Sequence, residues 1–433
     1  MRTSSLSFDH LSAYIRELPL IDCHEHMSSR ERIGDVLQFF CSGYYAHDLT
    51  SAAGEVATGR ILDASLPLDD RCDEFLHAWR ATRFTGYGIA VRYAMQRLFG
   101  IEEPTRANLK DAQERLPDYA EPDAFDRILE EAGIVVRISD CWPPPAGLID
   151  GSWEPLPRQR LALSLPFLHA IRTRGDLAPL ETACRATVTC LDEWLDLCRR
   201  YIEAGRDRGA VCLKDQSAYD RSITYRMPTR ADAEAVFNRI LADPRYHAEY
   251  DPDANALSDF LMHALMRIAR EADLPVQLHT GHMAGIRNDV AKANAAGLRS
   301  LIEVHRDVRF DLFHANWPYS SDALFLAKNY PNVTLDFCWT HIVDPVYARS
   351  MLVQAVSAVP HTKIHGFGSD VGGGLPHIAW AHAALAREVI ACALSDLVEM
   401  GHVTLSEAKE IARAWCFDNP NAFFGLGLTG SGE

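Results

Sequence analysis

Four short apolar runs of this sequence each end in histidine or aspartate. The runs cover residues 20–26, 276–279, 310–314 and 364–370, and they place His24, His26, His279, His314 and Asp370 at or near their ends. Imidazole nitrogens and carboxylate oxygens are the ligands that proteins offer to zinc and similar divalent ions. The parallel strands of a barrel open their carboxyl ends to one mouth, so ligands far apart in the sequence can reach one ion there. The pattern therefore predicts a metal site.

His24 and His26 are separated by Glu25 alone. Side chains two positions apart on a strand point to the same face, so both imidazoles can bind one ion. The spacing His-x-His is a weak signal by itself, and its place after an apolar run and beside Asp22 strengthens it. We predict that both histidines are metal ligands.

A second pair of histidines follows residues 275–278, where His279, Thr280, Gly281 and His282 could lead out of a strand. We expect His279 to be a metal ligand, although a histidine satisfied within the core would also fit this position. His282 is expected to orient a neighbouring side chain or to contact the substrate.

His314 and Asp370 are the predicted catalytic residues. If His24, His26, His279 and Asp370 bind one ion, His314 is free to act as an acid or base beside a metal-activated water. The alternative is that His314 is itself a second metal ligand. Asp370 follows two small residues, which allow close approach to the ion, and its carboxylate can both contact the metal and accept a proton from the water.

Lys214 stands at the end of the predicted fourth strand, beside Asp215. We favour a role as a cation that holds a substrate carboxylate or carbonyl, because the mononuclear ligand set is complete without it. The alternative is a lysine made nucleophilic by apolar neighbours, which takes up carbon dioxide as a carbamate that bridges two ions.

Further substrate contacts are predicted from residue types. Arg287 lies eight residues after His279, and Arg30 and Tyr44 follow the first strand; a guanidinium suits bidentate binding of a carboxylate. Surface positions would explain these residues equally well. Trp317 and Tyr319, which follow the sixth strand, offer rings on which a flat substrate could stack.

These side chains must be positioned by alternating strands and helices. Strands are predicted at residues 19–23, 134–138, 161–165, 210–214, 275–279, 308–314, 332–339 and 363–370. Helices are predicted at residues 73–86, 89–98, 187–204, 232–241, 256–272, 289–305, 321–329, 345–359 and 378–399 from apolar residues at helical spacing. Alternation of this kind indicates an α/β fold with a parallel sheet. Residues 28–130 are predicted to form a largely helical insertion over the barrel mouth, within a single domain that spans residues 1–433.

Composition excludes some classes of function. The chain has 433 residues and a net charge of −16 without a basic stretch, so nucleic-acid binding is not expected. We expect no membrane-spanning segment. The 11 cysteines show no disulfide framework, which favours buried free thiols in a reducing cytoplasm.

The motifs together resemble the amidohydrolase superfamily, and within it the amidohydrolase-2 branch and the amidohydrolase region of FluG-type proteins. Its signature is His-x-His after strand one, often a lysine after strand four, histidines after strands five and six, and aspartate after strand eight. The segments that carry the resemblance are residues 18–27, 313–319, 330–336, 363–370 and 418–426.

The resemblance implies a distorted (β/α)8 TIM barrel with a divalent ion, usually zinc and sometimes manganese. It implies that His24, His26, His279 and Asp370 are the ligands and that His314 polarises substrate or moves protons. Lys214 falls where dinuclear members carry a carbamylated lysine. Hydrolases, decarboxylases and uronate isomerases share such sites, so the fold does not choose among them.

The leading prediction is a metal-dependent hydrolase that uses metal-activated water on a C–N or C–O bond of a small polar molecule bearing a carboxylate. The first alternative is a lyase or isomerase of the same superfamily, such as an aromatic acid decarboxylase or a uronate isomerase. The second alternative is a non-catalytic, metal-stabilised binding module. Barrels of this kind often associate, so a homo-oligomer is compatible with the sequence.

Overall fold

The computed structural model describes residues 5–250 and 253–429. Within these residues, eight parallel strands follow one another around a single sheet. They are β1 (Leu20–Glu25), β2 (Ile134–Ser139), β3 (Gln159–Ser164), β4 (Ala210–Asp215), β5 (Val276–Leu278), β6 (Phe310–Leu312), β7 (Val333–Asp336) and β8 (Ile364–His365).

Backbone hydrogen bonds close the sheet between its last and first strands. Cys23 N donates to Phe367 O (3.1 Å), His26 N to Val371 O (2.8 Å) and Asp370 N to His24 O (2.9 Å). The pairs β1–β2 and β3–β4 contain register shifts, which distort the barrel. The predicted distorted (β/α)8 TIM barrel is confirmed, and every predicted strand overlaps an observed one.

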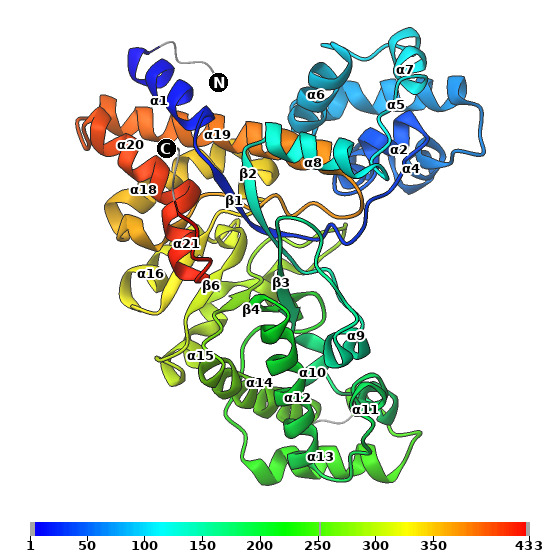
Figure 1. The fold of residues 1–433 in the computed structure, drawn as a ribbon, viewed down its shortest axis with the longest axis vertical. Helices are drawn as coiled ribbons and strands as arrows, with labels where there is room; N and C mark the ends of the chain where they lie inside the picture. The colour runs from blue at the N-terminus through cyan, green and yellow to red at the C-terminus, as the bar shows by residue number, and fades with distance from the viewer. Residues whose placement is uncertain (1–4, 251–252, 430–433) are drawn as a thin grey trace.

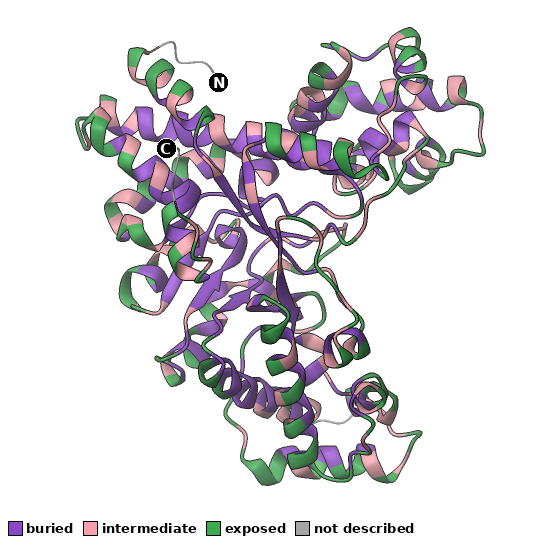
Figure 2. Ribbon diagram, viewed as in Figure 1, coloured by how far each residue is buried: buried purple, intermediate pink, exposed green. Residues whose placement is uncertain are grey.

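Helices surround the barrel (Figure 1). Those that follow β2 and later strands are α9 (Pro145–Asp150), α10 (Pro166–His169), α11 (Ala178–Cys184), α12 (Leu191–Asp207), α13 (Arg230–Ala242), α14 (Ala254–Glu271), α15 (Arg299–Val304), α16 (Ser320–Asn329), α17 (Thr340–Val343), α18 (Pro345–Ala358), α19 (Pro376–Glu399), α20 (Leu405–Arg413) and α21 (Asn419–Phe423). The strands are buried along nearly their whole length, as expected of a parallel sheet covered by helices (Figure 2).

Local signals explain why several helices begin where they do. Thr229 and Asp232 form a capping box at α13, and the Asp344 side chain accepts hydrogen bonds from the first turn of α18, which also begins with Pro345. The predicted helix 289–305 is wrong as a single element. This segment forms two 3-10 turns, η4 (Val290–Ala293) and η5 (Ala295–Leu298), before α15. The Asn294 side chain accepts a hydrogen bond from Ala296 N, so a new helical turn begins there instead of a continuous helix.

Seven helices lie between β1 and β2: α2 (Val36–Cys41), α3 (Tyr45–Ala53), α4 (Glu55–Leu62), α5 (Leu68–Thr82), α6 (Gly86–Phe99), α7 (Arg106–Gln113) and α8 (Pro122–Glu131). Most of them form the lobe at the upper right of Figure 1, and α8 reaches back to the barrel. Buried Arg71 forms two 2.7 Å hydrogen bonds with Asp35 inside this lobe. Gly86 brings α6 against α17, because a Cβ there would lie 1.9 Å from Ile342 O.

The long helix α19 bears on the expectation that the chain has no membrane-spanning segment. By length and composition alone it could cross a membrane, although the sequence was expected to contain no such segment. Most of α19 is buried inside the protein, where it packs against α1 (Leu6–Arg16), α6 and α18. These contacts are those of a core helix of a large barrel.

Candidate metal centre and active site

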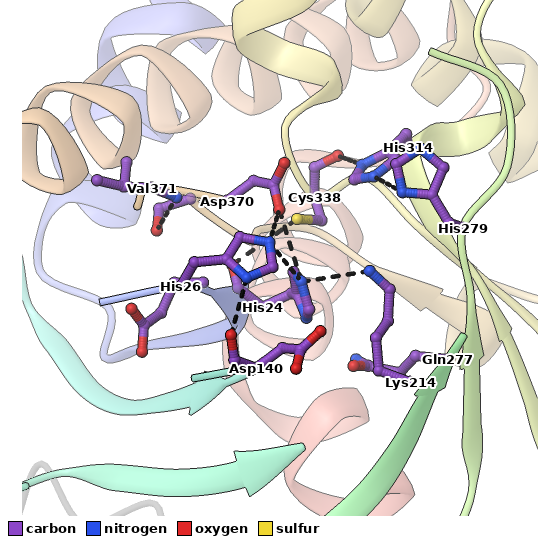
Figure 3. Close-up of polar contacts among 12 residues, drawn as sticks. His24, His26, Asp140, Lys214, Gln277, His279, His314, Cys338, Asp370 and Val371 are labelled. Atoms are coloured by element: carbon purple, nitrogen blue, oxygen red, sulfur yellow. Dashed lines mark hydrogen bonds and ion pairs between the residues drawn. The ribbon is translucent and has the colours of Figure 1, made fainter. Parts of the chain in front are cut away.

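Three predicted ligands converge at the seam where the barrel closes. The Nε2 atoms of His24 and His26 lie 3.3 Å apart, and Asp370 Oδ1 lies 3.6 Å from the first and 3.4 Å from the second (Figure 3). Ligand atoms about 2.0–2.1 Å from a tetrahedral zinc ion are separated by about 3.3 Å. The three atoms therefore fit one face of a tetrahedral metal site, which leaves a position open.

Asp22 fixes the two sides of this seam. Its Oδ1 accepts hydrogen bonds from Ser369 N (2.8 Å) and His24 N (3.3 Å), so it ties the loop after β8 to β1. Gly368 permits the close packing there, because a Cβ would lie 2.6 Å from Cys338 Cβ. Asp370 itself has a φ of 54°, in the left-handed region that turns its carboxylate toward the histidines (Figure 3).

Hydrogen bonds and burial set the protonation of these ligands. His26 Nδ1 donates to the carbonyl of Asp140 (2.9 Å), which leaves the Nε2 lone pair for a metal. Burial, with the nearby Lys214, holds the pKa of His24 well below 6.5, so its imidazole is neutral. Burial opposes ionisation of Asp370, but His26 outweighs it and lowers the pKa of that carboxyl below its ordinary value. Burial lowers the pKa of His26, but Asp370 outweighs it and raises that pKa above its ordinary value, so without a metal this imidazole tends to keep a second proton. A bound metal would displace that proton and leave two imidazoles and one carboxylate as ligands.

Asp140 is a further candidate ligand that sequence reasoning missed. It directly follows β2, and its side chain groups with His24 and His26 in an arrangement that could hold an ion. Both of its carboxylate oxygens are buried without a hydrogen-bond partner, which is costly unless a cation lies nearby. The signal in the sequence was its place at the end of a strand, the same signal that marked the other ligands.

His279 and His314 form a pair of their own beside this triangle (Figure 3). His279 Nε2 donates to His282 O (2.7 Å) and His314 Nδ1 donates to Cys338 O (3.0 Å). Their remaining nitrogens, His279 Nδ1 and His314 Nε2, face each other at 3.2 Å. Burial lowers the pKa of both rings, that of His314 to about 4, so two lone pairs meet and need a proton, a water or a cation between them.

This pairing differs from the predicted ligand set. His279 makes its polar contacts with His282 and His314, not with the triangle of His24, His26 and Asp370. His314 has a φ of 61°, a backbone conformation that is found at functional positions more often than elsewhere. His279 lines the same cavity as the triangle, and its role as a ligand stays a prediction.

Lys214 is buried next to the metal triangle. Its Nζ donates to His24 Nε2 (3.4 Å) and lies over the Phe313 ring, 4.7 Å from the ring centre. Its side chain is therefore held by an aromatic face and the His24 imidazole, and no carboxylate of the described residues forms an ion pair with it. It is placed to hold an anionic oxygen beside an ion.

A cavity of about 540 Å³ opens on these residues. His26, Lys214, His279 and Asp370 line its floor. Its walls are mainly aromatic and aliphatic, and their larger side chains are Phe40, Tyr44, Tyr45, Tyr87, Val91, Trp142, Tyr219, Leu375 and Ile378. No arginine is among the described residues that line it. Helices α2, α3 and α6 of the insertion supply one wall, so these segments cover the barrel mouth.

Comparison with known proteins agrees with this geometry. The family model described as Amidohydrolase matches residues 21–426. The chain belongs to the amidohydrolase family. A FluG protein of Emericella nidulans is 31% identical over 206 residues, which are 46% of this chain and 22% of that protein, so the chain spans about a fifth of that relative's length.

Solved structures show the same amidohydrolase fold at low sequence identity. A uronate isomerase from Thermotoga maritima superposes with a TM-score of 0.78 and 13% identity, over 96% of this chain and 97% of that one. A glucuronate isomerase from Caulobacter crescentus gives a TM-score of 0.73 and 17% identity, over 99% and 96% of the two chains. At such identities the likeness concerns the fold alone.

Several predicted substrate residues of this amidohydrolase lie outside the cavity lining. Arg287 is 78% exposed and pairs with Glu55 at 2.9 Å, because the loop after β5 turns outward; the structure does not support it as a carboxylate clamp. Arg30 is likewise engaged by Asp126 (2.8 Å).

The predicted aromatic contacts are also placed differently. The Trp317 ring contacts the rings of His282 and Tyr347, and Tyr319 O accepts a hydrogen bond from Asn316. None of these five side chains is among the described residues that line the cavity. Tyr44, predicted with Arg287 and Arg30 as a candidate carboxylate clamp, does line the cavity, and its hydroxyl lies near Asp370.

Proposed function

We propose that this protein is a metal-dependent hydrolase that cleaves a C–N or C–O bond in a small molecule with a carboxylate and a flat apolar part. The observation that carries the proposal is the triangle of His24, His26 and Asp370, open to a cavity on one side. Zinc is the first candidate metal and manganese the alternative. The buried free cysteines suit a reducing cytoplasm.

The residues present fit the roles that hydrolysis requires. A divalent ion bound here would act as a Lewis acid and bring the pKa of a water toward neutrality. Asp370 is ionised and can accept the proton of the attacking water. Tyr44, whose hydroxyl lies near that carboxylate, lines the cavity beside it. His314 is neutral, so its Nε2 can take up a proton and deliver it to the leaving group.

Lys214 and the cavity walls define the substrate. Lys214 is the cation among the described lining residues that can hold a substrate carboxylate or carbonyl oxygen. Trp142 stacks on the His26 ring at 5.1 Å, with 10° between the ring planes, and Tyr219 packs against His279 at 5.0 Å. A flat apolar group bound between these rings would reach the ligand triangle. The sugar acids of uronate isomerases would instead leave most of their hydroxyl groups facing apolar walls.

Decarboxylation of an aromatic acid is the second candidate, because the same aromatic walls and Lys214 would bind such a substrate. The two reactions differ in their products. Hydrolysis consumes water and releases an amine or alcohol with an acid, whereas decarboxylation releases carbon dioxide.

The test is an activity panel on the zinc-loaded and manganese-loaded protein. It would contain N-acyl and ester derivatives of aromatic acids, free aromatic acids and uronates. The products measured would be amine or alcohol, carbon dioxide, and ketose. Release of amine or alcohol by the wild type, and not by Asp370→Asn, would support the hydrolase. Carbon dioxide or ketose as the sole product would replace it with the lyase or the isomerase.

A further inference from the structure

A second group of ligand-type side chains lies inside the barrel, on the four neighbouring strands β6, β7, β8 and β1. Ligand atoms of Cys23, Asp336 and His365 all lie within 4.8 Å of one another. Asp311 joins them, because His365 Nδ1 lies 3.2 Å from Asp311 Oδ1 and 3.7 Å from Asp336 Oδ2. All four residues are fully buried.

The hydrogen-bond potential of this group is largely unused. Asp336 Oδ1 accepts from Cys338 N (2.6 Å), but Asp336 Oδ2, Asp311 Oδ1 and both ring nitrogens of His365 have no aligned hydrogen bond. Cys23 Sγ has only a 3.9 Å contact with Ile21 O. Native proteins rarely leave so many buried polar atoms unsatisfied in one place.

The charges of the group also favour a bound cation. Two carboxylates face one imidazole, and burial together with Asp311 raises the pKa of Asp336 to about 7, so the two carboxylates repel each other in a dry interior. An uncompensated charge is strongly destabilising when it is fully buried. A divalent cation between the carboxylates would relieve their mutual repulsion, and thiolate, imidazole and carboxylate together are the ligand types of zinc.

We propose that Cys23, Asp336 and His365, with Asp311, bind a divalent metal ion, zinc by ligand type, at a site separate from the cavity. On binding, the ion replaces the thiol proton of Cys23 and one imidazolium proton of His365, so two protons leave and the charge is unchanged. Zinc ligands lie about 3.3–3.8 Å apart at the usual bond lengths of about 2.0–2.3 Å, so small side-chain movements close the site.

The surroundings make this a closed, structural site. The rings of Phe423 and Phe424 lie 4.9 Å and 5.4 Å from the His365 ring. Arg309, just before β6, donates to Phe423 O (2.8 Å), so the C-terminal segment lies across the amino-terminal end of the barrel. The four residues are fully buried and are not among the described residues that line the catalytic cavity. An ion here would join β1 to β7 and β8. We therefore expect it to resist chelators that remove the cavity metal.

The test uses cobalt in place of zinc, because a thiolate ligand gives cobalt(II) a charge-transfer band in the near ultraviolet. We expect this band in the cobalt-loaded wild type and in His26→Gln, and its loss in Cys23→Ser. Cys212→Ser is the matched control: Cys212 is buried in the same apolar cluster as Cys23, and its thiol donates to Gln277 instead. After dialysis against EDTA, the wild type should keep one metal equivalent and Cys23→Ser none.

If the cobalt-loaded wild type shows no thiolate band, and wild type and Cys23→Ser hold equal amounts of metal, the proposal is overturned. The cluster would then be a His365 imidazolium between two carboxylates. If Cys23→Ser does not fold, X-ray absorption of the EDTA-treated, zinc-loaded wild type decides instead. A sulfur neighbour at about 2.3 Å from zinc supports the site. A zinc shell of nitrogen and oxygen alone, or no retained zinc, rejects it. Failure of the proposed hydrolase activity would not affect these results.

Discussion

At the residue scale, Asp370 combines the two properties that the proposed chemistry needs. It contacts both ligand histidines, and its carboxyl stays ionised although it is buried. A carboxylate in this position can contact an ion and accept a proton at the same time, which no neutral side chain can do.

Asp370→Asn should therefore lose both functions while it keeps the side-chain volume. We expect turnover to fall by about 10²–10⁴-fold, the usual contribution of a positioned base, together with most of the EDTA-labile metal. The measurements are initial rates and metal content of the purified variant. Asp126→Asn, which removes the partner of Arg30 away from the cavity, should keep the activity and the metal. Wild-type turnover in Asp370→Asn would show that another group is the base.

Lys214→Ala tests whether the lysine binds substrate or bridges two ions. We expect the EDTA-labile metal to stay at one equivalent and KM to rise at least about tenfold, since a charge-assisted hydrogen bond contributes about 1.5–3 kcal/mol. A fall from two labile equivalents to one or none would instead indicate a carbamate between two ions. In that case the facing nitrogens of His279 and His314 would be the ligands of the second ion.

At the element scale, the strands could be predicted because each is a short buried apolar run, and the parallel order followed from the helices between them. The convergence of His24, His26 and Asp370 was predictable for the same reason: the residue type is read directly, and the strand end fixes its place. The pairing of His279 with His314 was not, because each ring is oriented by a carbonyl outside its own strand, of His282 and of Cys338.

The walls of the cavity also lay beyond sequence reasoning. Tyr87 comes from α6, Trp142 from the loop after β2, and Tyr219 from the 3-10 turn η2 (Ser217–Tyr219). None of these positions has a periodicity or spacing that relates it to the metal ligands. Their meeting depends on how the insertion packs on the barrel, as at the contact between α6 and α17.

His377, in the first turn of α19, makes the docking of the insertion sensitive to acid. Its Nε2 donates to Phe39 O of α2 (2.8 Å), and burial lowers its pKa to about 3. The unfolded chain binds this proton below about pH 6.5 and the folded protein only near pH 3. Stability therefore falls as the pH falls between these values, by up to about 1.4 kcal/mol per pH unit.

His377→Gln keeps a side-chain donor and removes the titration. We expect urea midpoints measured at pH 7, 6 and 5 to fall less steeply in this variant than in the wild type. The urea midpoint of His377→Gln should still fall as the pH falls, because burial also lowers the pKa values of His341 and His382 to about 4. Exposed His10→Gln is the control, and equal slopes in His377→Gln and wild type would contradict the assignment.

At the scale of the whole molecule, the barrel closes where its predicted metal ligands lie. The seam between β8 and β1 is held by a few backbone hydrogen bonds, those of Cys23, His26 and Asp370 among them. A metal bound by His24, His26 and Asp370 would cross this seam and add bonds from both of its sides. The chain leaves the barrel for the insertion directly after β1, so the same seam also supports the lobe over the mouth (Figure 1).

Removal of the EDTA-labile metal should therefore loosen the seam before the rest of the barrel. A ligand at a hundredfold excess over its Kd stabilises the folded state by about 2.7 kcal/mol, so hydrogen exchange through seam opening should accelerate up to about a hundredfold without it. Mass-spectrometric exchange should show this at the amides of His26 and Asp370, whereas Leu163 and Leu213, in the pair β3–β4, should change little. Uniform acceleration in all strands would mean that the ion stabilises the fold as a unit, and no change at the seam would place the labile metal elsewhere.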